Sequence, residues 1–320
     1  MKKKILVTGG AGFIGSNFIR YLFSAYPKLS LVNLDKLTYA GRGANLGDLA
    51  ASPRYRFVKG DICDQQAVSQ AMRGCEIVIN FAAESHVDRS IVDPAQFVRT
   101  NVFGAHVLLE QARKNKISLF CQISTDEVYG SRMSGSFKET DRLEPSSPYS
   151  ATKAAADHLA LSYFITYKLP VVIVRPTNNF GPYQFPEKVI PLFVTNILKD
   201  KKVPLYGDGL NVRDWLYVQD CCRAIDIVIN RGRPGEIYNI AGKNEIKNIE
   251  LTRLILKMMD KPKNYISFVA DRPGHDRRYS LDPAKLARLG WRSRVAFTRA
   301  LGETIQWYVN NQKWWKRLKG

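Results

Sequence analysis

Short apolar runs alternate with helical patterns through the first half of the chain. The runs are rich in Val, Ile, Leu and Phe, and most of them end in Gly, Asp or Ser. Near-continuous apolar strands of this kind are expected in a parallel sheet whose two faces are both covered by helices. We therefore expect strands at KILVTG, LSLVNLD, YRFVKGD, EIVINFAA and ISLFCQIS.

A helix is expected between the last two strands. Residues 93–115, DPAQFVRTNVFGAHVLLEQARKN, open on Asp-Pro and carry apolar residues at helical spacing. Alternating strands and helices predict an α/β doubly wound parallel sheet, that is, a Rossmann domain. After LPVVIVRP the alternation breaks down, and Pro and Gly crowd residues 176–209. We expect a Rossmann domain of residues 1–175 with about 215–240, and a smaller mixed α/β lobe of 176–214 and 241–320.

The composition is ordinary for a globular protein, with 45% hydrophobic and 24% charged residues. No apolar stretch approaches the ~20 residues that span a bilayer. The start, MKKKILVTGG, predicts a first strand and not a signal peptide. Five cysteines without CxxC spacing, two of them adjacent at Cys221 and Cys222, indicate reduced thiols. These features together predict a cytoplasmic protein.

The chain is strongly basic. Its 48 Lys and Arg against 29 Asp and Glu give a net charge of +19, and the excess is concentrated after residue 243. A basic surface can attract nucleic acid, an anionic membrane or a phosphorylated substrate. The tail KWWKRLKG mixes Trp with cations, but no recognised nucleic-acid-binding motif accompanies the charge. A diphosphate substrate suffices to explain it.

Three glycines lie between the first strand and the first helix. Gly9, Gly12 and Gly15 in VTGGAGFIGS have GxxGxxG spacing, and Asp35 ends the next strand 20 residues after the last of them. Such glycines permit a tight turn and a close approach to a pyrophosphate at the helix N-terminus. The acid hydrogen-bonds a ribose 2′-hydroxyl and repels a 2′-phosphate, which favours NAD over NADP.

Tyr149 and Lys153 in YSATK lie one turn apart on one helix face. A free tyrosine, with a pKa near ~10, is a poor base at neutral pH. A nearby ammonium and the positive charge of a bound nicotinamide favour the phenolate. In isolation this pair is more often a surface contact, but here it follows a dinucleotide-type glycine motif by more than 100 residues.

Thr125, Asp126 and Glu127 in STDEVYG follow an apolar strand. Acidic pairs in loops usually mean only exposure to solvent. Removal of water from a sugar, however, needs one ionised and one protonated carboxyl group, and neighbouring carboxylates push each other's titrations apart. Consecutive side chains on a straight strand point in opposite directions, so we expect a bend after Ser124.

The glycine spacing, together with GDICD (60–64) and NFAAESHVDRS (80–90), resembles the short-chain dehydrogenase/reductase superfamily in its extended form. By that likeness Asp61 and Ile62 contact adenine, Lys153 holds the nicotinamide ribose and Tyr149 is the base. The implied NAD site contains Gly9, Gly12, Phe13, Ile14, Gly15, Asp35, Lys36, Thr38, Asp61, Ile62, Ala82, Ala83, Thr100, Tyr149, Lys153 and Asn179.

Several separate motifs across nearly the whole chain resemble the dTDP-glucose 4,6-dehydratase family and its UDP-glucose counterpart. They are STDEVYG, SPYSATKAAADHL, NNFGPYQFPEKVIPLF, YGDGLNVRDWLYVQD and DRPGHDRRYSLD. The resemblance implies a hydro-lyase with NAD regenerated in each turn. Tyr149 removes the O4 proton as a hydride leaves C4, and Thr125 binds the sugar near that oxygen. Glu127 then takes the C5 proton and Asp126 protonates the departing C6 hydroxyl. The hydride returns to C6, and C5 is reprotonated.

The same resemblance assigns a nucleotide-sugar site. Its implied residues are Ser85, His86, Thr125, Asn178, Glu187, Lys188, Pro204, Leu205, Tyr206, Arg213, Asn248, Arg272 and His275. Arg213 and Asn248 are expected to hold the diphosphate, with Arg272 and His275 closing over it. The alternative for Arg213 is a salt bridge to Asp214 or Asp220.

Other interpretations stay open at this point. UDP- or CDP-glucose is an alternative substrate, and 4-epimerases and UDP-glucuronate decarboxylases share the superfamily. An NAD-binding sensor that lost catalysis would typically lack Tyr149 or Lys153. The resemblance further implies a homodimer through helices around 93–115 and 149–168. The four histidines are far apart, so no metal site is expected.

Overall fold

Seven parallel strands form the central sheet of the computed structural model, which describes residues 4–319. Their order is β10-β6-β5-β4-β1-β2-β3, so the strand order reverses between β1 and β4. All five apolar runs expected as strands, and the sixth at LPVVIVRP, lie in this sheet, which confirms the predicted fold class. The strands are β1 (Lys4–Thr8), β2 (Ser30–Asp35), β3 (Tyr55–Lys59), β4 (Ile77–Asn80), β5 (Leu119–Ile123), β6 (Val171–Pro176) and β10 (Ile237–Ile240).

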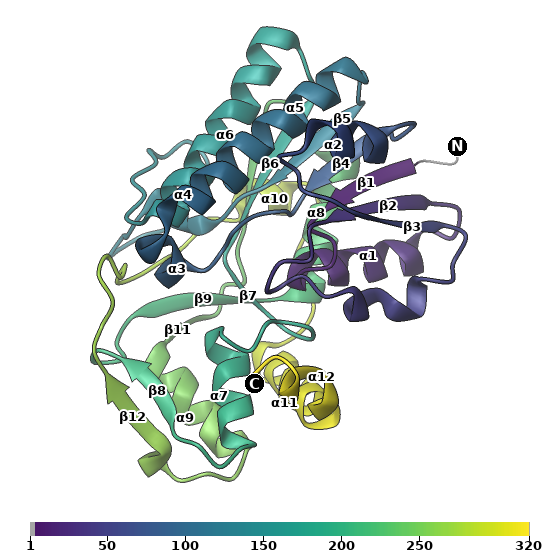
Figure 1. The fold of residues 1–320 in the computed structure, drawn as a ribbon. Coiled ribbons are helices and arrows are strands. Elements are labelled where there is room, and N and C mark those ends of the chain that lie inside the picture. Colours follow the sequence, from purple (N-terminus) through teal and green to yellow (C-terminus); the bar gives the residue numbers. More distant parts are fainter. Residues whose placement is uncertain (1–3, 320) are drawn as a thin grey trace.

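Helices cover both faces of the sheet (Figure 1). Successive residues of β1 enter two different cores: Ile5 and Val7 pack into one, and Leu6 packs into the other. This arrangement explains why the strands are apolar on both sides. One face carries α1 (Phe13–Ala25), the 3₁₀ segment η1 (Gly43–Leu49) and α8 (Val218–Arg231), and the other carries α2 (Gln65–Met72), α5 (Gly104–Lys114) and α6 (Pro148–Tyr167).

The helix expected over residues 93–115 is interrupted by a π-helical turn. It consists of α4 (Pro94–Phe97), the π-turn η2 (Val98–Phe103) and α5, and it follows a short helix α3 (Val87–Val92). A π-turn inserts one extra residue per turn, and such turns occur frequently at functional sites. Here the turn contains Asn101, whose buried amide bonds to the backbone of Glu84 and to the Thr152 hydroxyl.

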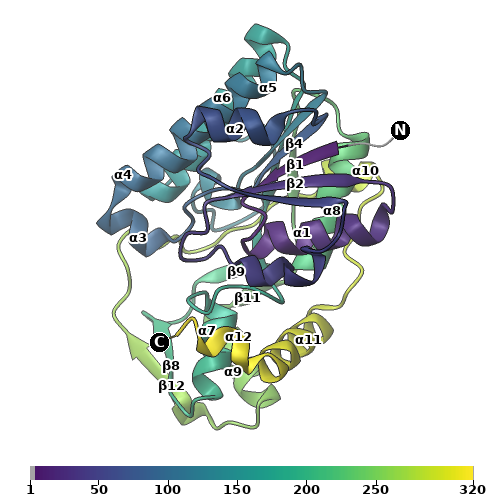
Figure 2. The same cartoon turned by 45° about the vertical axis from the view of Figure 1, so that its right-hand side comes forward.

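The smaller lobe lies below the sheet in Figures 1 and 2. It contains a three-stranded sheet, β11-β9-β7, and a parallel pair, β12-β8. Its strands are β7 (Asn178–Phe180), β8 (Val203–Tyr206), β9 (Val212–Tyr217), β11 (Glu245–Lys247) and β12 (Ile266–Val269). Its helices are α7 (Val189–Ile197), α9 (Asn248–Met258), α11 (Phe297–Asn310) and α12 (Gln312–Lys316).

The two units interleave along the chain. After β9 the chain returns to the Rossmann domain through α8 and β10, and it then re-enters the lobe at β11. A further short helix, α10 (Ala284–Arg288), packs against β10 although the flanking elements belong to the lobe. The ends of the two expected domain ranges, residues 1–3 and 320, lie outside the described residues.

Within residues 4–319, no helix combines the length and the apolar character needed to cross a bilayer. The same residues contain no group of three or more His, Cys, Asp or Glu side chains placed to share a metal ion.

Candidate active site

The glycine turn after β1 is pressed against the strand end of β4. Gly9 has a left-handed backbone, with φ of +67°, and a Cβ atom there would lie 2.5 Å from the Ala82 nitrogen. A Cβ atom on Gly15 would lie 2.4 Å from the Gly9 carbonyl oxygen. Gly12 is the N-cap of α1, so the backbone of this turn opens directly at a helix N-terminus. This is the geometry that phosphate groups of a dinucleotide require.

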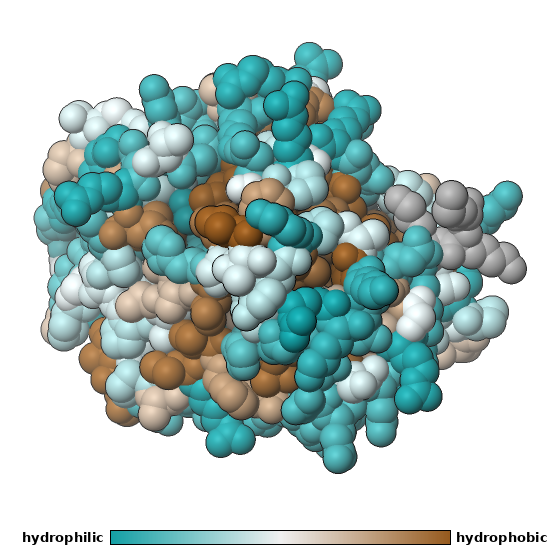
Figure 3. Space-filling model, turned by 90° about the horizontal axis from the view of Figure 1, so that it is seen from above, coloured by the Kyte–Doolittle hydropathy of each residue, from teal (hydrophilic) through white to brown (hydrophobic). Residues whose placement is uncertain are grey.

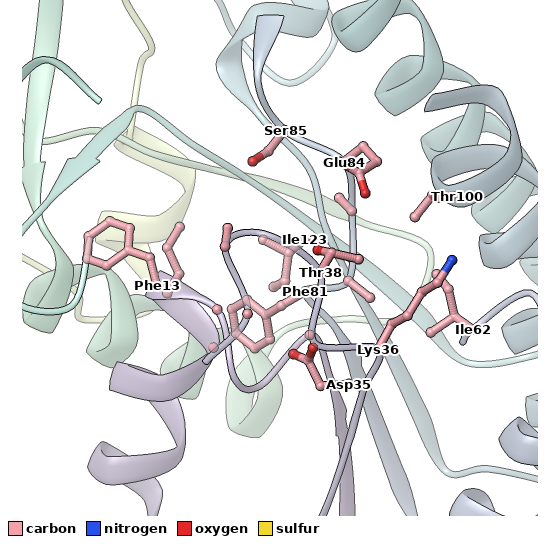
Figure 4. A pocket seen from close by; sticks show the side chains of 18 of the residues that line it. Phe13, Asp35, Lys36, Thr38, Ile62, Phe81, Glu84, Ser85, Thr100 and Ile123 are labelled. Atoms are coloured by element: carbon pink, nitrogen blue, oxygen red, sulfur yellow. The ribbon is translucent and has the colours of Figure 1, made fainter. Parts of the chain in front are cut away.

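Asp35 connects the glycine turn to the loop after β2. Its carboxylate accepts hydrogen bonds from the backbone nitrogens of Ala11 (2.9 Å) and Leu37 (2.8 Å). Burial raises the pKa of Asp35, and these two bonds oppose the rise. The next residue, Lys36, pairs with Asp61 at 2.8 Å. Loops from three neighbouring strands are therefore tied together around one cleft (Figure 4).

The cleft brings together nearly all of the residues expected to bind NAD. Gly9, Gly12, Phe13, Ile14, Gly15, Asp35, Lys36, Thr38, Asp61, Ile62, Ala82, Ala83, Thr100, Tyr149 and Lys153 line it. Asn179 does not; its carbonyl oxygen accepts a bond of 2.9 Å from the amide of Gln184, which does line the cleft. The lining of the cleft thus combines a backbone turn at a helix start, an acid positioned by backbone donors and an apolar slot. These features fit a dinucleotide.

The bend expected after Ser124 is present. Strand β5 ends at Ile123, and Asp126 opens a 3₁₀ turn, η3 (Asp126–Tyr129). Thr125 is the N-cap of this turn: its hydroxyl accepts from the Glu127 nitrogen at 3.3 Å and donates to Asp126 at 3.1 Å. Because the chain leaves strand geometry here, the two carboxylates are not forced to opposite faces of the strand. They lie close enough that, besides burial, the charge of Glu127 raises the pKa of Asp126.

The two adjacent acids have different surroundings. Asp126 is only 3% exposed, one of its carboxylate oxygens has no protein partner, and burial together with Glu127 raises its pKa well above the usual range. Burial also raises the pKa of Glu127, but Arg272, Lys188 and Arg213 oppose that rise. These environments favour a protonated Asp126 and an ionised Glu127.

Tyr149 and Lys153 reach the same place from α6. This helix begins with a capping box at Ser147, and the Lys153 ammonium donates to the Ile123 carbonyl at 2.5 Å. Burial lowers the pKa of Lys153 to about 8, and Asp157 opposes that shift. Burial and Glu127 raise the pKa of Tyr149, and a hydrogen bond with Thr125 opposes the rise. The sequence predicted that the phenolate would be favoured; in the protein alone burial and the Glu127 carboxylate raise the pKa of Tyr149 instead. The charge of an oxidised nicotinamide therefore has to supply the stabilisation of a phenolate.

Three of the residues expected to bind the nucleotide sugar line this cleft. They are Ser85, Glu187 and Lys188, and Lys188 donates to the Ser85 carbonyl at 3.0 Å. His86 is the N-cap of α3. The remaining ones lie in the lobe: Asn178, Pro204, Leu205, Tyr206, Arg213, Asn248, Arg272 and His275. Leu205 is buried within the lobe, at 3% exposure, so its side chain serves packing.

Arg213 makes no salt bridge to Asp214 or Asp220, so the alternative interpretation of this residue is wrong. Its guanidinium donates to the carbonyls of Val212 (2.7 Å) and Asp276 (2.8 Å) and lies 4.2 Å from the centre of the Tyr279 ring. Asp214 instead accepts backbone bonds from Gly242 and Asn244. A positive charge without a carboxylate partner is thereby held near the acidic pair.

Several buried polar atoms of the substrate side have no protein partner. They are the side-chain carbonyl oxygens of Asn178 and Asn248, Nε of Arg272 and Nδ1 of His86, in addition to Oδ2 of Asp126. Buried polar groups normally find partners, so unpaired atoms gathered on one side of a cleft call for an explanation. A diphosphate and a sugar supply the acceptors and donors that such atoms need.

Sequence reasoning missed some residues of the cleft. Phe81, Glu84, Ser124, Gln184 and Phe185 line it as well. Glu84 is 9% exposed, and burial raises its pKa. Ser124 could have been found, since it ends the predicted strand and precedes Thr125. No local pattern distinguishes Gln184 and Phe185, which reach the cleft only through the folding of the lobe.

Comparison with known proteins places the chain among nucleotide-sugar enzymes. The family model described as "GDP-mannose 4,6 dehydratase" matches residues 6–304. A dTDP-glucose 4,6-dehydratase of Streptomyces niveus is 51% identical over 99% of this chain and 96% of its own length.

Two solved structures share the fold closely. The dTDP-glucose 4,6-dehydratase of Streptomyces venezuelae, with NAD and TYD bound, is 50% identical with a TM-score of 0.97, covering 98% of this chain and 99% of the other. The Bacillus anthracis dTDP-glucose 4,6-dehydratase in complex with NAD is 47% identical with a TM-score of 0.93, covering 99% of each chain.

Proposed function

This chain belongs to the dTDP-glucose 4,6-dehydratase family, and on that premise we propose how its own residues carry out the NAD-dependent dehydration of dTDP-glucose to a 4-keto-6-deoxy sugar. It is a hydro-lyase on a Rossmann fold. One observation carries the assignment of roles: Thr125, Asp126 and Glu127 leave β5 at a bend and meet Tyr149 beside a cleft suited to NAD.

Oxidation at C4 depends on Tyr149 and Thr125. When bound, NAD supplies a hydride acceptor for C4 and later the hydride donor for C6. Tyr149 takes the proton from the O4 hydroxyl, and Thr125, whose hydroxyl opposes the rise in the pKa of the tyrosine, orients the O4 hydroxyl. Lys153 is fixed by the Ile123 carbonyl and provides positive charge on the same helix face.

Water elimination depends on the difference between the two acids. Once C4 is a ketone, the proton on C5 is acidic, and Glu127 removes it because three cations favour its ionised form. Asp126 is buried and carries the proton that the departing C6 hydroxyl needs to leave as water. Arg213 and Arg272 bind the diphosphate, since planar guanidinium groups match phosphate oxygens.

We further propose that the protein forms a homodimer through α3–α5 and α6. Large apolar side chains are exposed on these elements, among them Val92 (86% exposed), Val98 (52%), Phe103 (51%) and Ile165 (66%). Figure 3, which views the molecule from above this helical layer, shows apolar residues between hydrophilic ones. Sedimentation tests the dimer: the wild type is expected to have the mass of a dimer and Phe103→Glu that of a monomer. The same mass for the two proteins would contradict this interface.

A cytoplasmic location is also proposed. All five cysteines are free, and four of them are buried, which suits a reducing compartment.

The activity is tested by incubating the purified protein with dTDP-, UDP- and CDP-glucose and identifying the 4-keto product by NMR. With dTDP-glucose deuterated at C4, the deuterium is expected at C6 of the product. Tyr149→Phe should abolish the transfer. Loss of the deuterium to solvent would contradict an intramolecular hydride return. Conversion of UDP- or CDP-glucose alone would contradict the substrate, and a C4 epimer formed without loss of water would contradict the reaction.

A further inference from the structure

Three segments that are distant in sequence meet across the cleft. The first is the loop 36–42 after β2, the second is the start of α3, and the third is the segment 181–188 between β7 and α7. Thr38, Ala40 and Gly41 line the cleft from the first segment, while Phe185 and Glu187 line it from the third. The side chains between them therefore join the Rossmann side of the cleft to the lobe side.

Tyr39 is the centre of this junction. The Arg89 guanidinium carbon lies 3.6 Å from the centre of the Tyr39 ring, and Phe185 contacts the ring edge-on, with ring centres 5.5 Å apart at 88°. Arg89 also pairs with Glu187 at 3.2 Å. Burial of the ring raises the pKa of the Tyr39 phenol, and the Glu187 carboxylate is close enough to raise it further.

Glu187 is tied to α3 a second time. His86 Nε2 lies 3.6 Å from the same carboxylate oxygen that Arg89 contacts. The Glu187 side chain is only 16% exposed, whereas the Arg89 side chain is 49% exposed. The junction therefore has a buried acidic centre and an arginine cover that faces solvent.

We propose that Tyr39, Arg89 and Glu187 form a clasp that closes the cleft between the Rossmann domain and the lobe and slows the departure of bound NAD. Each contact alone is weak, because an ion pair open to solvent and a cation–π contact at an exposed site contribute little. Together they join three segments, so the cleft can open only when all of them break.

Retention of NAD rests on the proposed function and deepens it. The hydride taken from C4 returns to C6 of the same sugar, so the reaction never requires the dinucleotide to leave between turnovers. A clasp made from several weak contacts holds the cofactor through many turnovers and still permits exchange. None of its three residues belongs to the chemical pair at 126–127 or to the Tyr149–Lys153 helix face.

The clasp is tested by the rate at which radiolabelled NAD leaves the purified holoenzyme after addition of excess unlabelled NAD. Arg89→Gln is expected to accelerate release about tenfold, since it removes both the stacking and the ion pair. Arg89→Lys keeps the charge but loses the planar stacking, so it should give an intermediate rate. The double variant Tyr39→Ala with Arg89→Gln should accelerate NAD release by less than the product of the two single effects, because the two residues act in one network.

The matched control is Arg132→Gln. Arg132 also pairs with a carboxylate, that of Asp141 at 3.0 Å, and lies 4.1 Å from the centre of an aromatic ring, that of Phe137, but it lies outside the cleft. Release from this variant should match the wild type. Equal release rates for Arg89→Gln and Arg132→Gln would overturn the clasp. No sugar is present, so a wrong substrate assignment would leave this measurement unaffected.

Discussion

The two walls of the cleft are built differently. On the Rossmann wall the backbone itself forms the site: the Gly9–Gly15 turn packs within atomic contact of Ala82, and Asp35 is held by two backbone nitrogens. On the lobe wall long polar side chains project from separate segments, and buried atoms of Asn178, Asn248 and Arg272 have no protein partner.

This difference separates a wall formed mainly by backbone from a wall formed mainly by side chains. The Rossmann wall is fixed by the packing of β1, β2 and β4, so cofactor affinity depends on backbone geometry. The lobe wall keeps unpaired donors and acceptors at a cost in stability, and that cost is recovered when a diphosphate sugar binds. The acidic pair at 126–127 lies where both walls meet.

The largest effect is expected where the walls meet. Asp126→Asn should reduce dehydration roughly 10²- to 10⁴-fold, because a proton donor is lost, while NAD and dTDP affinities stay close to those of the wild type. Transient NADH absorbance at 340 nm should still report oxidation at C4. Glu127→Gln should block the removal of the C5 proton with a similar magnitude. The control is Glu144→Gln, an exposed carboxylate on a nearby loop; normal dehydration by Asp126→Asn would contradict its role as the acid.

A smaller effect is expected on the lobe wall. Arg272→Gln should weaken dTDP binding roughly 10- to 100-fold, measured by calorimetry, because a charged hydrogen bond to phosphate is lost. The melting temperature without ligand should fall only slightly, since the one ion pair that Arg272 makes, with Asp88 at 3.3 Å, is open to solvent and contributes little. Arg277→Gln is the matched control on the same loop, where Arg277 pairs with exposed Asp208. A lower melting temperature with unaltered affinity would mean that this wall is structural.

On the Rossmann wall we expect a substitution to lower the stability of the protein as well as its affinity for the cofactor. Gly15→Ala places a Cβ atom 2.4 Å from a backbone oxygen, which should cost about 1–3 kcal/mol of stability and reduce the NAD content of the purified protein. Gly47→Ala is the control, because no atom lies within 4 Å of the new methyl group. If Gly15→Ala retained both the melting temperature and the NAD of the wild type, the wall would not depend on close backbone packing.

The same contrast explains what could be predicted from the sequence. Gly9, Gly12, Gly15 and Asp35 are local signals, because the turn, the helix start and the strand end that they require lie within 30 residues. Tyr149 and Lys153 are one helical turn apart, and the bend after Ser124 follows from two acids that must face the same way. These parts of the fold and the site were visible in the pattern of residues and in the family resemblance.

Other features could not be predicted because they depend on tertiary contacts. Tyr39 gains its role from Arg89 and Glu187, which are about 50 and 150 residues away in sequence. The π-turn in residues 98–103 shifts the helical period by a single residue, which a pattern of apolar positions does not resolve. The packing of α10 against β10 likewise has no local signal.

The smallest effect concerns the charge of Lys153. Burial lowers its pKa to about 8, below the value of 10.5 in an unfolded chain, and Asp157 opposes that shift. Lysine is charged below its pKa, so hydride transfer should decline as the pH rises above about 8, by at most tenfold per pH unit. Between pH 8 and 10.5 the unfolded chain binds the proton more tightly, so this residue makes folding more favourable as the pH rises, opposite to the trend in activity.

Asp157→Asn should move the alkaline decline to lower pH, because the only opposing charge is removed. Arg175, which pairs with Asp157 at 2.9 Å, would then be buried without a carboxylate and would destabilise the fold, although it still donates to the Tyr129 hydroxyl. The double variant Asp157→Asn with Arg175→Gln removes both charges, and it should show the same shift in the pH profile. If the profile of the double variant coincided with that of the wild type, Asp157 would not set the pKa of Lys153 and would only anchor Arg175 and Ser124, whose hydroxyl donates to it at 2.9 Å.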